Sequence, residues 1–170
     1  KGARLVESAL EIPPYLSVEF RFENLPRGTA GSIRDAVDPQ RDELIFVFPA
    51  AIVSPPDLHD LIGVHRDKSA FMTVFFNPSR ENPEEISQDA QIYVCQPEAV
   101  DYIPLAGYFD LKENLIPALV QAEKTIALGR LSRHAGNYRH WHEYLSAVRQ
   151  YLLAMEPHDP WLGSYHSCDG

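Results

Sequence analysis

Runs of apolar residues recur along the chain and predict strands. The segments Glu43–Phe48, Ala70–Phe76 and Ala90–Cys95 are almost continuously apolar. Such runs are typical of strands buried on both faces of a sheet. The segment Tyr15–Glu23 instead alternates apolar and polar residues, which predicts a strand with one exposed face. The pattern therefore predicts four strands in the first 95 residues.

Helical patterns lie between and after these strands. Ala3–Leu10 predicts a short helix, and the small-residue segment Arg27–Val37 predicts a tight loop that runs into a second one. We expect Ser54 to cap the next helix, because proline follows it at the first helical position. We expect Asn114 to cap a further helix, with Pro117 in its first turn, where proline is tolerated.

The last long helix begins near His140 and has an apolar side that we expect to be buried. Its members are Trp141, Tyr144, Leu145, Val148 and Leu152. Helices and strands alternate through residues 1–155, which predicts one α/β domain with a mainly parallel sheet and helices on both faces. Residues 156–170 are rich in proline, glycine and polar residues, and predict a linker or a C-terminal tail.

The composition is that of a soluble globular domain. Of the 170 residues, 45% are hydrophobic and 23% charged, and the net charge is −9. An acidic chain argues against a broad surface for nucleic acid or for anionic membranes, because both require clusters of Lys and Arg. The two cysteines, Cys95 and Cys168, suggest neither a disulfide framework nor a zinc site. Without an apolar run long enough to span a membrane or a signal-peptide pattern, we expect a cytoplasmic protein.

The stretch "NLPRGTAGSIRDA" carries the most specific signal for function. A glycine-bracketed loop at the start of a helix lets the backbone approach a ligand closely, and the helix N-terminus favours negative charge. The motif alone is short, and a tight turn from strand to helix explains it equally well.

The order of segments resembles the sugar-1-phosphate nucleotidyltransferases, also called nucleotide-sugar pyrophosphorylases. It runs from "GTAGSIRDA" through "ELIFVF" and "AQIYVCQPEAVDYIP" with "YFDLKENLIPALV" to "YLSAVRQYLL", and covers roughly residues 3 to 155. The resemblance implies a Rossmann-like domain that joins a nucleoside triphosphate to a sugar phosphate with loss of pyrophosphate. It also implies that the domain here lacks its N-terminal strands.

The resemblance assigns roles to individual residues. The loop formed by Gly28, Thr29, Ala30 and Gly31 would lie against the nucleotide base. Glu23 matches a position that helps to read the edge of the base, and Tyr93 a position that lines the sugar pocket.

Two positions depart from the family in a way that bears on chemistry. Phosphoryl transfer in the family depends on a divalent metal ion held by two aspartates, and these positions are Ala51 and Asn137 here. Mg²⁺ requires oxygen ligands, of which a methyl group has none, and an amide offers one without charge. A unit charge pair about 4 Å apart contributes on the order of 4 kcal/mol at an effective dielectric near 20, so both losses weaken the site severely. A shifted alignment or an engineered substitution would also explain the alanine.

Further family features are missing. The glycine-rich triphosphate loop would precede residue 1, and "NPSRENPEEISQD" replaces a longer segment with a Glu-Lys-Pro motif. Gln91 stands where the family has glycine. A domain without the strands that normally lie beside Glu43–Phe48 would expose the edge of a central strand, which invites pairing with another chain.

Three hypotheses remain open. The chain is a nucleotidyltransferase-like domain without catalysis that acts as a regulatory or assembly subunit, with residual binding of nucleotide or nucleotide-sugar. Alternatively it is part of an active enzyme, or it shares only the general architecture. The first predicts no cofactor and a homo-oligomer or partner subunit; the second requires Mg²⁺. Neither predicts a nucleic-acid or membrane partner.

Other polar clusters are better explained by structure. His134, His140 and His142 are close in sequence, but residues two apart on a helix do not share a face, so a metal site is disfavoured. Asp57 and Asp110 each precede a predicted helix, where an acidic side chain caps the first turn.

Overall fold

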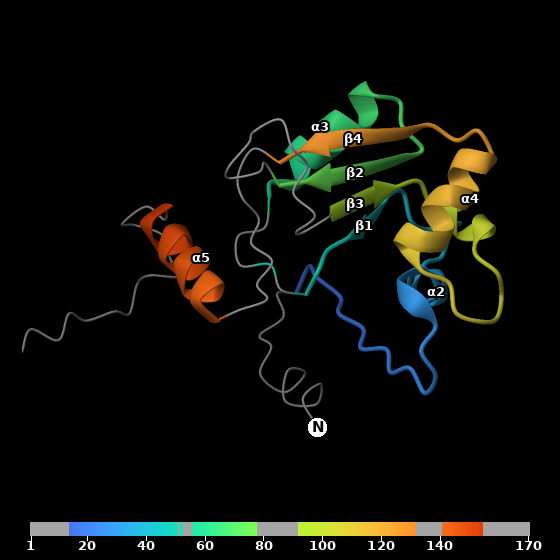
Figure 1. The fold of residues 1–170 in the computed structure, drawn as a ribbon, viewed down its shortest axis with the longest axis horizontal. Helices are drawn as coiled ribbons and strands as arrows, with labels where there is room; N and C mark the ends of the chain where they lie inside the picture. The colour runs from blue at the N-terminus through green and yellow to red at the C-terminus, as the bar shows by residue number, and fades with distance from the viewer. Residues whose placement is uncertain (1–13, 51, 53–55, 78–91, 132–140, 155–170) are drawn as a thin grey trace, which may run out of the picture.

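The computed structural model describes residues 14–50, 52, 56–77, 92–131 and 141–154. Its elements follow one another in an α/β order (Figure 1). They are α2 (Gly28–Ala36), β1 (Ile45–Val47), α3 (Leu58–Asp67), β2 (Met72–Phe76), β3 (Ile92–Cys95), the 3₁₀-helix η1 (Pro97–Tyr102), the π-helical turn η2 (Leu111–Leu115), α4 (Ile116–Gln121), β4 (Ile126–Arg130) and α5 (Trp141–Ala154). The α/β fold class predicted from the sequence is confirmed.

The four described strands form one sheet in the order β1-β3-β2-β4. Strands β2 and β4 pair in parallel, whereas β3 is antiparallel to both of its neighbours, β1 and β2. Three of these strands therefore run in one direction. Because the reversed strand lies inside the sheet, two of the three pairings are antiparallel, and the prediction of a mainly parallel sheet needs this correction.

Helices cover both faces of the sheet, as predicted. On one face, α2, η1, η2 and α4 bury apolar side chains against alternate residues of the strands, among them Met72, Val74 and Tyr93. On the other face, Leu61 and Val64 of α3 pack against Phe75, Ile92 and Val94. The alternation of strand side chains between these two apolar layers explains why the runs are apolar throughout.

The predicted strand at Tyr15–Glu23 is absent. The alternating pattern predicts an extended segment, but a strand also requires a hydrogen-bonded neighbour, and none of the four described strands pairs with this segment. Tyr15 and Phe22 consequently remain exposed among the residues described. In contrast, β4 was not predicted, because Gly129 and Arg130 interrupt its apolar run. Ala3–Leu10 lies outside the described residues.

Asp57 and Asp110 cap the two helix starts, as predicted, whereas the caps also predicted at Ser54 and Asn114 are wrong. Asp57 caps α3 by accepting a hydrogen bond from the backbone N–H of His59 at 2.8 Å, while Ser54 lies outside the described residues. Asp110, four residues before Asn114, caps η2, and η2 leads directly into α4. Asn114 instead accepts a hydrogen bond from the N–H of Asp110 at 2.8 Å. A carboxylate is the better acceptor for the N–H groups at a helix start.

The apolar side of α5 is exposed, although we expected it to be buried. Trp141 is 75% exposed, and Tyr144, Leu145 and Leu152 are also exposed. Figure 1 shows α5 apart from the sheet, so the described elements leave this side uncovered. The predicted helix is confirmed, but helical periodicity does not specify which surface packs against the helix. No helix among the residues described is long and apolar enough to cross a bilayer.

Candidate functional site

The glycine loop predicted from the sequence forms the start of α2 and packs directly on the main chain at Phe109. Gly28 has a φ of 76°, in the left-handed region that favours glycine. A Cβ at this position would lie 2.5 Å from the carbonyl oxygen of Phe109, so only glycine fits. The predicted role of this glycine in close backbone approach is therefore met by the protein's own chain.

Backbone hydrogen bonds hold these two segments together. The N–H groups of Ala30 and Gly31 donate to the Phe109 oxygen at 3.1 and 3.2 Å. The N–H of Phe109 in turn donates to the oxygen of Arg27 at 2.8 Å. The first N–H groups of a helix have no partner within the helix, and here two of them are satisfied by a carbonyl oxygen. These two groups are thus occupied and cannot also bind a phosphate.

Side chains add a second connection between the same segments. The hydroxyl of Thr29 donates to Oδ2 of Asp110 at 3.0 Å and accepts from the N–H of Leu111 at 2.9 Å. Oδ1 of Asp110 accepts from the N–H groups of Lys112 and Glu113 at 2.8 and 3.1 Å. We call residues 27–31 with 109–111 the glycine-loop junction. It ties the start of α2 to the start of η2.

The charge state of Asp110 follows from these bonds. Burial alone would raise the pKa of this carboxyl group. The N–H groups of Glu113 and Lys112, the Thr29 hydroxyl and the Lys112 charge together lower the pKa below its ordinary value. Asp110 is therefore ionised near neutral pH, as a permanent acceptor for Thr29.

Glu23 also lies against the start of α2. Its carboxylate accepts from the hydroxyl of Ser32, and from the N–H of Arg27 at 3.3 Å. The Ser32 hydroxyl and then the Arg27 N–H hold the pKa of Glu23 below its usual range. The structure thus brings Glu23 to the glycine loop, as the resemblance implies. Its role in reading a base stays a prediction.

Tyr93 lies in the centre of the sheet. It pairs with Val47 of β1 and Val74 of β2, and belongs to the same apolar cluster as Ala30. The residue is 5% exposed, and burial followed by the negative charge of Asp110 raises the pKa of its hydroxyl. Tyr93 is therefore a neutral core residue on the face that also holds the junction. Its predicted role in a sugar pocket remains a prediction.

Ala51 and Asn137, which the resemblance places where the family has its metal-binding aspartates, lie outside the described residues. Their chemistry does not fit a divalent cation, because one side chain has no oxygen and the other only a neutral amide. In the part of the chain that the structure describes, no three His, Cys, Asp or Glu side chains gather closely enough to hold a metal ion.

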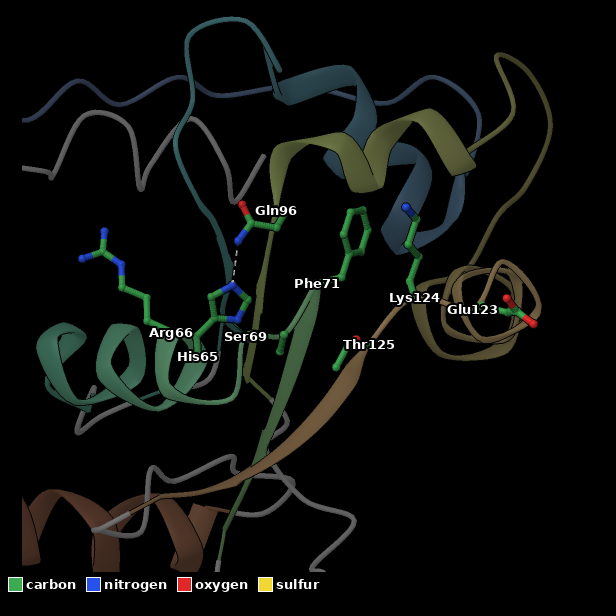
Figure 2. A pocket seen from close by; sticks show the side chains of 9 residues that line it. His65, Arg66, Ser69, Phe71, Gln96, Glu123, Lys124 and Thr125 are labelled. Carbon is green, nitrogen blue, oxygen red and sulfur yellow. Dashed lines mark hydrogen bonds between the residues drawn. The ribbon is translucent and has the colours of Figure 1, made fainter.

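A hollow of about 520 Å³ lies at the edge of the sheet where β2 and β4 begin (Figure 2). In open α/β sheets, ligands bind at the opposite edge, where the parallel strands end. The ammonium group of Lys124 lies 5.0 Å from the centre of the Phe71 ring. In Figure 2 the Arg66 side chain points away from Phe71 and Lys124. The cations of this hollow do not converge on one point.

His65, beside this hollow, is fully buried and has a hydrogen-bond partner at each ring nitrogen. Nδ1 is 2.9 Å from the Thr73 hydroxyl, and Nε2 is 3.2 Å from Nε2 of Gln96. Burial and then the charge of Arg66 lower the pKa of His65. The group is thus a neutral structural residue rather than a metal ligand or an exposed base.

Sequence reasoning missed Phe109 and the link between Thr29 and Asp110. Phe109 makes its contacts through backbone atoms. A backbone contact between segments about 80 residues apart in the sequence does not depend on which amino acids are present, so the sequence does not reveal it. Asp110 was recognised as a helix cap, which accounts for only one of its two oxygens. The contacts of His65 with Thr73 and Gln96 were also missed. They join residues from three separate segments, and a local sequence pattern does not show which segments meet.

Comparisons with known proteins agree with this fold. No protein-family model matches the chain. The chain is 25% identical over 128 residues to mannose-1-phosphate guanylyltransferase of Mycobacterium tuberculosis. This alignment covers 62% of the chain and 36% of the relative, so the chain spans about a third of that protein's length.

A solved structure shares the architecture. The chain superposes on HddC from Yersinia pseudotuberculosis, crystallised with GMP-PN, with a TM-score of 0.64 and 13% identity. The match covers 89% of the chain and 75% of HddC. At this identity the likeness establishes the fold. Together the two comparisons agree with the predicted resemblance: the chain is similar in sequence to a sugar-1-phosphate nucleotidyltransferase and shares its fold with a nucleotidyltransferase-like structure.

Proposed function

We propose that this chain is a nucleotidyltransferase-like domain that binds a nucleotide or nucleotide-sugar without catalysing its formation. It would serve as a regulatory or assembly subunit. The observation that carries this proposal is the presence of Ala51 and Asn137, which by the resemblance occupy the positions of the family's metal-binding aspartates. Without two carboxylates, a divalent ion loses several kcal/mol of attraction, at roughly 4 kcal/mol for a charge pair about 4 Å apart.

The glycine-loop junction supports ligand binding by the uncharged part of a nucleotide. The N–H groups of Ala30 and Gly31 are engaged by Phe109 and are not available to phosphate oxygens. Glu23 adds a carboxylate beside the loop, which disfavours phosphate and can accept hydrogen bonds from a base. A base against the loop, with phosphates directed away from it, fits these groups.

A subunit role is supported by two incompletely covered features. Strand β1 is at the edge of the described sheet, with one side unpaired to any described strand. The apolar side of α5 is exposed. Both features favour association with another chain. Light scattering should give a mass well above the 19.2 kDa of one chain. A monomer at all concentrations would contradict the subunit role.

A pyrophosphate-release assay tests the absence of catalysis. The full chain is incubated with Mg²⁺, GTP and mannose-1-phosphate, the substrates suggested by the name of the relative, and then with other nucleoside triphosphates and sugar-1-phosphates. We expect no turnover above the buffer control from protein that is folded by circular dichroism. Turnover that disappears with EDTA would instead support the alternative, a fragment of an active enzyme.

A further inference from the structure

We propose that Asp110 is a positioning residue for the Gly28–Gly31 loop, and that it acts through the hydroxyl of Thr29. This inference rests on the proposed function, because the loop is the proposed contact for the nucleotide base. Neither the comparisons nor the sequence pattern assign such a role to Asp110 or Thr29.

The two carboxylate oxygens of Asp110 have separate partners. Oδ1 caps η2 through the N–H groups of Lys112 and Glu113. Oδ2 accepts from Thr29 in the first turn of α2, 81 residues away in the sequence. One side chain therefore fixes the starts of two helical segments relative to each other.

The hydroxyl of Thr29 is fixed in turn. It donates its single proton to Asp110 and accepts a hydrogen bond from the N–H of Leu111. Its rotation is therefore fixed by two partners, the first residue of η2 and the residue that precedes η2. A charge-assisted hydrogen bond is stronger than a neutral one. Thr29 follows Gly28 directly, so this bond fixes the residue next to the left-handed turn of the loop.

Without this connection, the loop would be joined to residues 109–111 by its backbone bonds to Phe109 alone. The charge of Asp110 also lies next to the N-terminus of α2, where a negative charge is favourable. The connection therefore both orders the loop and balances the partial positive charge there. A ligand that packs on the loop would find it in one conformation and would not have to order it on binding.

Three variants of the full chain test the inference. Thr29→Val keeps the shape of the side chain and removes both hydrogen bonds, whereas Thr29→Ser keeps the hydroxyl. Asp110→Asn keeps an oxygen that can cap η2 but removes the charged acceptor for Thr29. Thr73→Val is the matched control, because Thr73 bonds to His65 on another part of the sheet.

Two readouts separate positioning from general stability. Amide hydrogen exchange at Ala30 and Gly31 should become about fivefold faster in Thr29→Val, since the net contribution of a hydrogen bond is roughly 1 kcal/mol and 1.4 kcal/mol is tenfold. Titration with GTP in EDTA should show an affinity loss of similar size. Thr29→Ser should stay within about twofold of the parent chain in both measurements.

Asp110→Asn should follow Thr29→Val, and Thr73→Val should lower the melting temperature without changing either readout. Unchanged exchange and unchanged GTP affinity in a folded Thr29→Val variant would overturn the inference. So would an equal loss in Thr73→Val. If the parent chain binds neither GTP, guanosine nor GDP-mannose, the proposed function fails; the exchange rates then still decide whether Asp110 orders the loop.

Discussion

Gly28 lies against the carbonyl group of Phe109 so closely that no side chain fits between them. A Cβ at Gly28 would stand 2.5 Å from the oxygen and 2.7 Å from the carbon of that group, and the φ of 76° disfavours any other residue. We expect Gly28→Ala to lower the free energy of unfolding by about 2 kcal/mol or more, because a left-handed conformation alone costs about 1–2 kcal/mol. Binding of GTP should disappear as well. Urea unfolding and a GTP titration measure the two effects.

Two other glycines provide controls for this prediction. Gly107 has a φ of 95° but open space around it, so Gly107→Ala should cost about 1 kcal/mol and leave binding intact. Gly63, inside α3, has an ordinary φ and nothing within 4 Å. Gly63→Ala should therefore stabilise the protein by about 0.5–1 kcal/mol. If Gly28→Ala behaved like Gly107→Ala in both assays, the packing against Phe109 would be wrong.

The contact between β4 and β2 can be tested at Gly129. A Cβ there would lie 2.5 Å from two ring carbons of Phe75, which is 1% exposed. Gly129→Ala should cost about 1–3 kcal/mol by overpacking. In a chain that already carries Phe75→Leu, the same Gly129→Ala change should cost less stability than it does in the parent chain. Additive losses in the double-mutant cycle would mean that the two residues are not in contact.

His65 predicts a specific dependence of stability on pH. Burial and Arg66 lower its pKa in the folded state, so the unfolded chain takes up a proton on this histidine at a higher pH than the folded chain does. The contribution of neutral His65 is therefore complete above the ordinary value near 6.5 and decreases as pH falls below it, until the lower folded pKa is reached. Denaturant unfolding measures the free energy of unfolding at pH 8 and at pH 5.5. The decrease in this free energy from pH 8 to pH 5.5 should be smaller in His65→Gln than in the parent chain. Equal losses in both would place the titrating group elsewhere.

The apolar runs were sufficient to predict the layered core, but the pairing of the strands was not. Runs such as Ile92–Cys95 are buried on both faces whether their neighbours are parallel or antiparallel, so the direction of β3 left no trace in them. The segment at residues 15–23 has the right alternation, yet a strand depends on a partner that a local pattern does not specify. Contacts across the fold decide such cases.

For the candidate site, the sequence identified the loop but not what lies against it. The sequence predicts that Gly28 and Thr29 contact a ligand. In the structure, the main chain of Phe109 packs against Gly28, and the carboxylate of Asp110 accepts a hydrogen bond from Thr29. Glu23 lies beside the loop, only five residues before Gly28, and its role at a base stays a prediction. The contact with Phe109 involves main-chain atoms, which residue identity does not predict.

Introducing carboxylates at residues 51 and 137 tests the proposal that these are vacated metal positions. The double variant Ala51→Asp, Asn137→Asp should acquire Mg²⁺-dependent binding of GTP, with at least about a tenfold gain when Mg²⁺ replaces EDTA, since each charge pair can contribute on the order of a few kcal/mol. The neutral variant Ala51→Asn, in the otherwise unchanged chain, serves as the control for side-chain size. A gain in that control, or none in the double variant, would show that these positions do not face the phosphates.

The most direct test of the central claim is a calorimetric titration of the unmodified chain with GTP, performed once in Mg²⁺ and once in EDTA. Because neither Ala51 nor Asn137 supplies a charged oxygen for a divalent ion, we predict the same dissociation constant under both conditions. An affinity that rises strongly with Mg²⁺ and collapses in EDTA would contradict the claim that this domain has lost its metal site.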